Sequence, residues 1–155
     1  MKKRLALAAC ALLIVLAISS PGFGQRSSQA QVRQSAQSWL GLVDSGRYAQ
    51  SWDAASPEFK AKISKARWEA MLTRARAPLG KEESRVFRIV HEADNPPNSP
   101  PGKYEFVQYS TAYRKQPRAT ETVALIQGKD GKWRVIEYAI HSGELRSVRP
   151  PRPSR

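Results

Sequence analysis

The fold is decided by residues 120–141, which read TETVALIQGKDGKWRVIEYAIH. Two runs rich in apolar and β-branched residues, 120–127 and 133–141, flank the tetrapeptide Lys129-Asp-Gly-Lys132. Asp-Gly is favoured in tight hairpin turns because the central residues of such turns take positive φ angles. The stretch therefore predicts two antiparallel strands joined by a short turn.

Two further strands are predicted upstream of this hairpin. Residues 85–93 are rich in Val, Ile and Phe, and four prolines and a glycine in 95–102 predict a loop after them. Residues 104–114 alternate, so that one side of the strand would carry Val107, Tyr109, Thr111 and Tyr113. These strands complete a predicted four-stranded antiparallel sheet.

The chain before residue 80 has helical periodicity instead. Apolar residues fall on one face of a long helix that Ser45-Gly46 would end: Val32, Ala36, Trp39, Leu40 and Val43. Three shorter apolar stripes follow, carrying Tyr48, Trp52 and Ala55, then Phe59 and Ile63, then Trp68, Met71, Leu72 and Ala75. Ser56-Pro57 and Ser64 are typical helix starts, and Pro78 and Gly80 would stop the last helix. Helices followed by strands predict an α+β domain in which a curved sheet buries the long helix.

Residues 1–24 have the features of a signal peptide. Three basic residues precede an apolar run of 14 residues, 5–18, which is shorter than the about 20 needed to span a bilayer. Gly22 and Gly24 flank Phe23 in the small-x-small arrangement of a cleavage site, so we expect cleavage before Gln25. The predicted organisation is a leader over 1–24, one domain over 25–145 and a tail over 146–155.

Cys10 is the one cysteine of the chain, and it lies inside the predicted leader. After cleavage the protein would hold no disulfide, thiolate nucleophile or cysteine metal site. Two alternatives stay open at this stage: lipoprotein processing at Leu7-Ala-Ala-Cys10, and an uncleaved anchor. The favoured interpretation is a bacterial periplasmic or secreted protein with no stable membrane span after processing.

The predicted tail is basic and rich in proline. It carries Arg146, Arg149, Arg152 and Arg155, has no acidic residue, and is expected to be disordered or polyproline II. The formal net charge of +13 falls to about +10 when the three basic leader residues are removed. Two roles fit such a tail: solubility, or electrostatic binding of an anionic envelope polymer. Nucleic acid is the least accessible partner for an exported protein, and no aromatic residues are interleaved for base stacking.

Several blocks of the chain resemble a bacterial exported family known as domain of unknown function 4019. The first is Trp39-Leu-x-Leu-Val-Asp-x-Gly-x-Tyr-x-x-Ser-Trp52, and the later ones are Trp68 with Arg76-Ala-Pro-Leu-Gly80, then Pro101-Gly-x-Tyr104, then Glu121-Thr-Val123, and Asp130-Gly-Lys-Trp-Arg-Val135 with Tyr138-x-Ile140. The resemblance implies the cone-shaped fold of nuclear-transport-factor-two-like, or cystatin-like, proteins. It assigns no activity, although some cone-shaped domains are isomerases or dehydratases that use a carboxylate or histidine base.

The pocket candidates are Trp52, Tyr109, Glu121, Trp133 and Tyr138. Glu121 shares a strand face with Val123 and Leu125, so its carboxylate would point toward the core, where it must be paired or neutral. Arg134 or Lys132 across the hairpin is the expected partner, which makes Glu121 a structural residue or a pocket acid. Trp39, Trp52 and Trp68 lie on apolar helix stripes, and all four tryptophans are expected in the core.

Catalytic signatures are weak throughout. Neighbouring His91 and Glu92 would point to opposite faces of a strand, and His141 is expected at the surface. Two histidines 50 residues apart make a metal site improbable, and neither a Gly-x-Ser-x-Gly elbow nor a phosphate-binding glycine loop occurs. We therefore expect no catalytic residue, metal or cofactor.

The expected function is a non-enzymatic binding or interaction module of the cell envelope. Its partner would be an unknown protein or a small-molecule ligand, and a homodimer formed through a sheet face is one form of such a module. The alternatives are a small-molecule pocket protein with acid–base chemistry, which would need a cavity of about 300 Å³ or more, and a binder of anionic polymer.

The leader generates a direct test. Expression of the full chain in a bacterial host should yield a mature protein whose first residue is Gln25, because residues 1–24 carry the features that signal peptidase recognises. N-terminal sequencing and intact mass measure this. A lipid-modified Cys10 or a retained leader would contradict it.

Overall fold

The computed structural model describes residues 23–143, with side chains from residue 29 onward. Four helices precede four strands, which confirms the predicted α+β class and the change of periodicity near residue 80. The helices are α1 (Phe23–Asp44), α2 (Tyr48–Ala54), α3 (Pro57–Lys62) and α4 (Lys65–Arg76). The strands are β1 (Glu82–Asp94), β2 (Lys103–Tyr113), β3 (Gln116–Gln127) and β4 (Trp133–Ser142).

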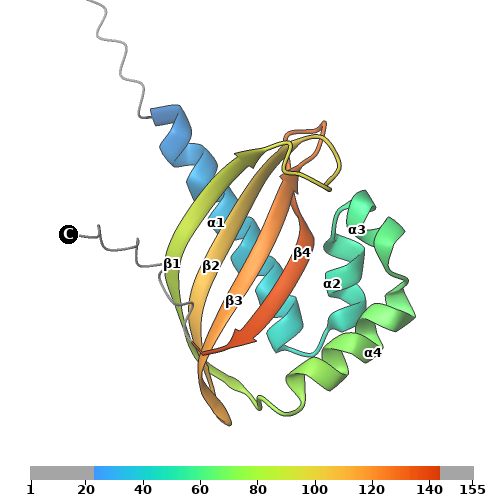
Figure 1. Cartoon of the computed structure of the whole chain (residues 1–155), viewed down its shortest axis with the longest axis vertical. Coiled ribbons are helices and arrows are strands. Elements are labelled where there is room, and N and C mark those ends of the chain that lie inside the picture. The colour runs from blue at the N-terminus through green and yellow to red at the C-terminus, as the bar shows by residue number, and fades with distance from the viewer. Residues whose placement is uncertain (1–22, 144–155) are drawn as a thin grey trace, which may run out of the picture.

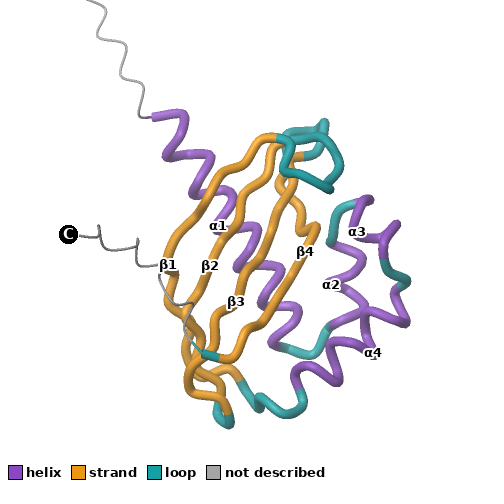
Figure 2. Tube along the Cα trace, viewed as in Figure 1, coloured by secondary structure: helices purple, strands orange, loops and turns teal. Residues whose placement is uncertain are grey.

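The strands form one antiparallel sheet in the order β1-β2-β3-β4, so β1 and β4 are its edges. The sheet is curved, and α1 crosses one of its faces while α2, α3 and α4 lie beyond the β4 edge (Figure 1). The opposite face, toward the viewer in Figure 2, has no helix over it within the described chain. The β4 edge of the sheet therefore faces the short helices α2, α3 and α4 (Figure 1).

The core fills the space between α1 and the sheet. All five residues of the predicted α1 stripe are buried, as are the four residues predicted to share one side of β2. Trp39 and Trp68 are 4% and 1% exposed, and both indole N–H groups bond to Ser51, one to its carbonyl and one to its hydroxyl. The prediction that these tryptophans are core residues is confirmed, and Trp52 is half-buried.

The stripe predicted for α4 was partly wrong. Met71 is 45% exposed and Ala75 is exposed as well, whereas Arg76 is 7% exposed. The buried face of α4 is Trp68, Leu72 and Arg76, at successive intervals of four residues, because a buried carboxylate draws Arg76 inward. The charged Arg76 is thus buried at the end of α4, where the apolar stripe had predicted that Ala75 would be buried.

The predicted helix starts and the predicted hairpin turn are confirmed. Ser56 and Ser64 cap α3 and α4, each accepting a hydrogen bond from the backbone N–H three residues later. In the predicted hairpin, Gly131 has φ 75°, and its N–H bonds to the carbonyl of Gly128. These caps fix where the short helices start beside β4.

Two sequence predictions fall outside the described residues: the tail over 146–155 and all but the last two residues of the leader. Within the described part, no helix combines the length and the apolar character that crossing a membrane requires.

Candidate functional site

A fully buried carboxylate lies where the ends of several elements meet. Glu121, in the middle of β3, is 0% exposed, which confirms that its side chain points into the core. Its Oε2 accepts hydrogen bonds from Arg85 Nε and Thr111 Oγ1, each at 2.6 Å. Its Oε1 accepts from the Tyr113 hydroxyl at 2.6 Å and also from the hydroxyl of Tyr138. Every strand of the sheet therefore contributes to holding one anion.

Two arginines link this carboxylate to a second one at the end of α1. Arg76 Nη1 lies 3.4 Å from Glu121 Oε1, and Arg76 Nη2 lies 2.5 Å from Asp44 Oδ1. Arg85 bonds to Asp44 through both terminal nitrogens, at 2.7 and 3.0 Å. We call the seven interacting residues the Glu121 cluster: Asp44, Arg76, Arg85, Thr111, Tyr113, Glu121 and Tyr138.

The cluster holds its carboxylates in the ionised form. Burial raises the pKa of Glu121, but hydrogen bonds and charge from Arg85, with the bonds from Thr111 and Tyr113, leave the pKa below its ordinary value. The pKa of Asp44 is likewise lowered, since Arg85 and Arg76 outweigh burial. Burial and the charge of Glu121 raise the pKa of Tyr138. A buried, ionised carboxylate that already accepts five hydrogen bonds is a poor general base, so the geometry is that of a structural clamp.

Two predicted partnerships were wrong. Arg134 does not pair with Glu121 but makes a bidentate contact with Asp130, at 2.7 and 2.9 Å, and Lys132 makes no side-chain contact with Glu121. The register explains this, because Glu121 lies opposite Ile140, far along the ladder from the hairpin turn. Asp44, next to the Ser45-Gly46 helix end, binds both guanidinium groups through its carboxylate.

The structure brings Glu121 and Tyr138 together, with Tyr109 opposite Glu121 in the ladder. The Tyr109 hydroxyl and the Trp133 indole N–H are buried without a hydrogen-bond partner among the described residues. Trp133 and Tyr138 border different surface hollows, and Trp52 borders neither of them. None of the hollows described for residues 29–143 is lined by more than one of the five pocket candidates.

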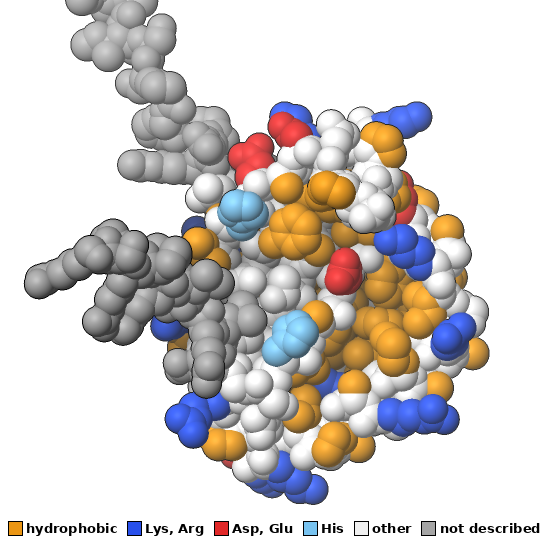
Figure 3. Space-filling model, viewed as in Figure 1, with side chains coloured by type: hydrophobic (Ala, Val, Ile, Leu, Met, Phe, Trp, Pro, Cys, Tyr) orange, Lys and Arg blue, Asp and Glu red, His pale blue; other side chains and the backbone are white. Residues whose placement is uncertain are grey.

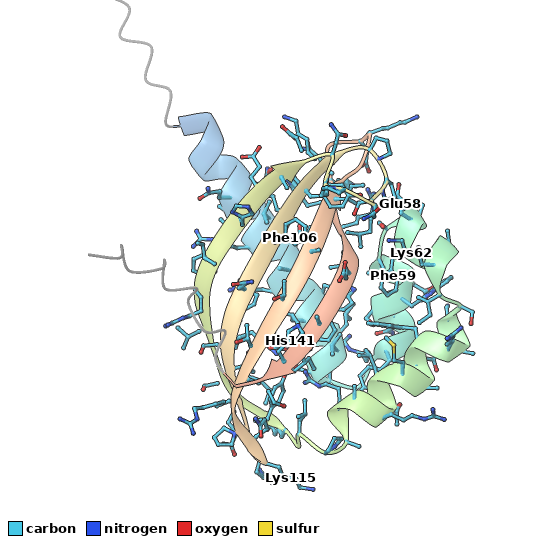
Figure 4. All side chains as sticks on the ribbon, viewed as in Figure 1. Glu58, Phe59, Lys62, Phe106, Lys115 and His141 are labelled. Atoms are coloured by element: carbon cyan, nitrogen blue, oxygen red, sulfur yellow. The ribbon has the colours of Figure 1, made fainter. Side chains whose placement is uncertain are left out.

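An apolar groove runs along the outer side of β4. It has a volume of about 220 Å³. We call it the β4 groove, and it is lined by Phe59, Lys62, Ile63, Trp68, Met71, Ile136, Glu137 and Tyr138. Figure 3 shows apolar side chains gathered over this hollow, with basic side chains along its outer margin. In Figure 4, Phe59 and Lys62 lie on the α3 side, facing β4.

A larger cleft lies between the start of α3 and the β3–β4 hairpin. Its volume is about 580 Å³, and its walls combine apolar Ala54, Pro57 and Ile126 with charged Glu58 and Lys129. None of the five predicted candidates lines this hairpin cleft. Among residues 29–143 no group of three or more His, Cys, Asp or Glu side chains is placed to hold a metal ion.

Comparison with known proteins assigns the chain to a family. A family model described as "Protein of unknown function (DUF4019)" matches residues 35–138. The chain belongs to this family. No curated protein matches the sequence.

Two solved structures resemble this DUF4019 chain. A structure from Catenulispora acidiphila, 13% identical, has a TM-score of 0.52 and covers 76% of this chain and 93% of its own. ActVI-ORFA from Streptomyces coelicolor, also 13% identical, has a TM-score of 0.45 with coverages of 74% and 96%. The predicted family and the nuclear-transport-factor-two-like cone fold are thereby confirmed.

Replacing Glu121 of this DUF4019 protein by Gln should lower the free energy of unfolding by about 3 kcal/mol, because Arg76 and Arg85 lose a buried counter-charge. Urea denaturation at pH 7 measures the change. The matched control is Glu83→Gln, whose exposed contact with Arg114 at 3.6 Å should be worth under about 0.5 kcal/mol. Equal effects of the two variants would show that the cluster is not a clamp.

Glu105 is a second buried carboxylate, and its pKa is shifted in the opposite direction to that of Glu121. It is 5% exposed, and its Oε2 has no hydrogen-bond partner among the described residues. Burial, together with the charge of Glu92 directly across the ladder, raises its pKa. The ionised form therefore destabilises the fold, and the penalty disappears as pH falls through the raised pKa.

Glu105→Gln should consequently raise the free energy of unfolding at pH 7, by roughly 1 kcal/mol. The gain should shrink at lower pH, where the native carboxyl is already protonated. Thermal or urea denaturation of both proteins between pH 4 and 7 measures it. An advantage that does not depend on pH would contradict the assignment, since packing alone would then account for it.

Proposed function

We propose that this chain is an exported protein of the bacterial cell envelope, periplasmic or secreted, which binds a partner in the β4 groove without catalytic turnover. Support for export comes from the signal-like features of residues 1–24 and from a mature sequence free of cysteine. The DUF4019 domain acts as a rigid support that presents one apolar surface to this partner.

The observation that carries the proposal is the composition of the groove. Aromatic and aliphatic side chains line an open hollow, and Met71 at its rim is 45% exposed. Apolar surface gathered in a hollow and bordered by charge is characteristic of interaction sites, because burial of that surface by a partner is favourable. Lys62 and Glu137 supply the polar rim.

Binding without turnover is favoured by the state of the acidic groups. Tyr138 lines the groove, yet its hydroxyl is committed to Glu121, whose carboxylate is buried and saturated with donors. Proton transfer to a ligand would require one of these groups to leave a partner. A ligand in the groove therefore meets the ring of Tyr138 as a packing surface.

The hairpin cleft supports a second candidate function, binding of a small molecule. Its volume of about 580 Å³ lies within the range of ligand pockets. Glu58 and Lys129 would provide charges of both signs for orienting a polar ligand. Binding of anionic polymer through the arginine tail stays a prediction from sequence, since the tail lies outside the described residues.

Site-specific photo-cross-linking in living cells discriminates among these functions. A photoreactive residue at Met71 should give discrete adducts, because partner atoms would lie within contact distance of the groove rim. The same residue at Lys129 reports on the hairpin cleft, and at Lys115, on the distant β2–β3 turn in Figure 4, it serves as control. Gel mobility and mass spectrometry identify the adducts. Adducts at Lys129 alone, or equal patterns at Met71 and Lys115, would exclude the β4 groove.

A further inference from the structure

We propose that the occupant of the β4 groove is an extended acidic peptide segment of a partner protein, which adds to β4 as a fifth strand. This rests on the proposed function, because it specifies the partner of the same groove. Three independent features support it: a free strand edge, an apolar hollow beside that edge, and a basic outer wall.

The register of β4 identifies the backbone groups at the free edge. The Gly143 N–H bonds to the Arg118 carbonyl at 2.8 Å, so these residues form a hydrogen-bonded pair of the β3–β4 ladder. Pairs alternate in antiparallel sheets, and Tyr138 and Ile140 therefore belong to non-hydrogen-bonded pairs whose N–H and C=O groups point away from β3. Among residues 23–143, no other backbone group outside the sheet bonds to those of Tyr138 or Ile140.

The edge is blocked at its other end, which limits where a strand can add. The Ser56 N–H, at the start of α3, bonds to the Val135 carbonyl at 2.9 Å and so occupies the outer side of β4 there. An added strand would begin past this contact and run beside residues 137–142. An edge of that length suits a short linear segment.

The apolar hollow gives such a segment a place for side chains. Alternate side chains of a strand point to opposite faces, so one set would enter the groove between β4 and α4. There it would meet Phe59, Ile63, Trp68 and Met71. Backbone pairing would supply affinity, and this hollow would select apolar residues at alternate positions.

The charges on the outer wall select an acidic segment. Helices α3 and α4 together contain six basic and two acidic residues. Lys62, Arg67 and Arg74 have no ion-pair partner among the described side chains, so their charge is available to a ligand. Glu137 is the acidic residue among those lining the groove. A peptide with glutamates at the positions that do not enter the hollow would complement this wall.

The test uses the mature protein and synthetic seven-residue peptides in which glutamate and valine alternate. We expect binding in a calorimetric titration, weakening as salt rises, and slower exchange of the Tyr138 and Ile140 amides by NMR. Lys62→Glu should weaken binding about threefold to fivefold, while Lys115→Glu, on the distant turn, should leave it unchanged. A peptide in which lysine replaces glutamate should bind more weakly than the acidic one.

N-methylation separates strand addition from simple adhesion. Methylating the amides of one alternate set of residues should abolish binding, while methylating the other set should preserve it, because only one set faces β4. Binding that survives both modifications, or that leaves Tyr138 and Ile140 unprotected, would overturn strand addition and leave groove binding intact. Protection of these amides in the protein alone, with dimers in sedimentation, would identify a second copy as the occupant and overturn the proposal. Absence of adducts at Met71 in cells would instead refute the proposed function.

Discussion

The structure depends on the removal of one carboxylate from water. Moving an ionised carboxylate into a protein interior costs several kcal/mol, and the cost is recovered only when well-oriented donors surround it. Glu121, on β3, is surrounded by donors from the other three strands and from the end of α4. Asp44 then extends the same network to the end of α1.

The same constraint shapes the groove. The hydroxyl of Tyr138 is bound to Glu121, and its ring packs edge-on against Trp39, with 5.3 Å between centroids. These two contacts fix the side chain of Tyr138, which forms part of the β4 wall of the groove. Arg76 anchors the end of α4, and that helix supplies Trp68 and Met71 to the other wall. The spacing between the two walls is therefore set by an ionic contact buried beneath them.

The sequence predicted elements better than it predicted partners. Periodicity and turn chemistry located all eight elements, since each signal is local. The alternation of β3 also placed Glu121 inside. Its two arginine partners lie 36 and 45 residues away along the chain, and only the register and the helix packing bring them to Glu121.

A signal for one partner was nevertheless present. Trp68, Leu72 and Arg76 recur every four residues, so the stripe that buries the first two residues also carries the third. This signal was missed because the stripe was drawn through Ala75, which is apolar, and not through Arg76. No comparable signal marks Arg85, which lies among other charged residues at the start of β1, or the groove, which forms between segments about 70 residues apart.

The position of Tyr138 near the end of the described chain has a consequence for biogenesis. A polypeptide that emerges amino-terminus first presents Asp44, Arg76, Arg85 and Glu121 before the residue that closes over them. Until β4 has been synthesised, the two carboxylates and two guanidinium groups stay hydrated, and the partly synthesised chain lacks the buried Glu121 cluster. Completion of the cluster therefore waits for β4, the last of the four strands in chain order.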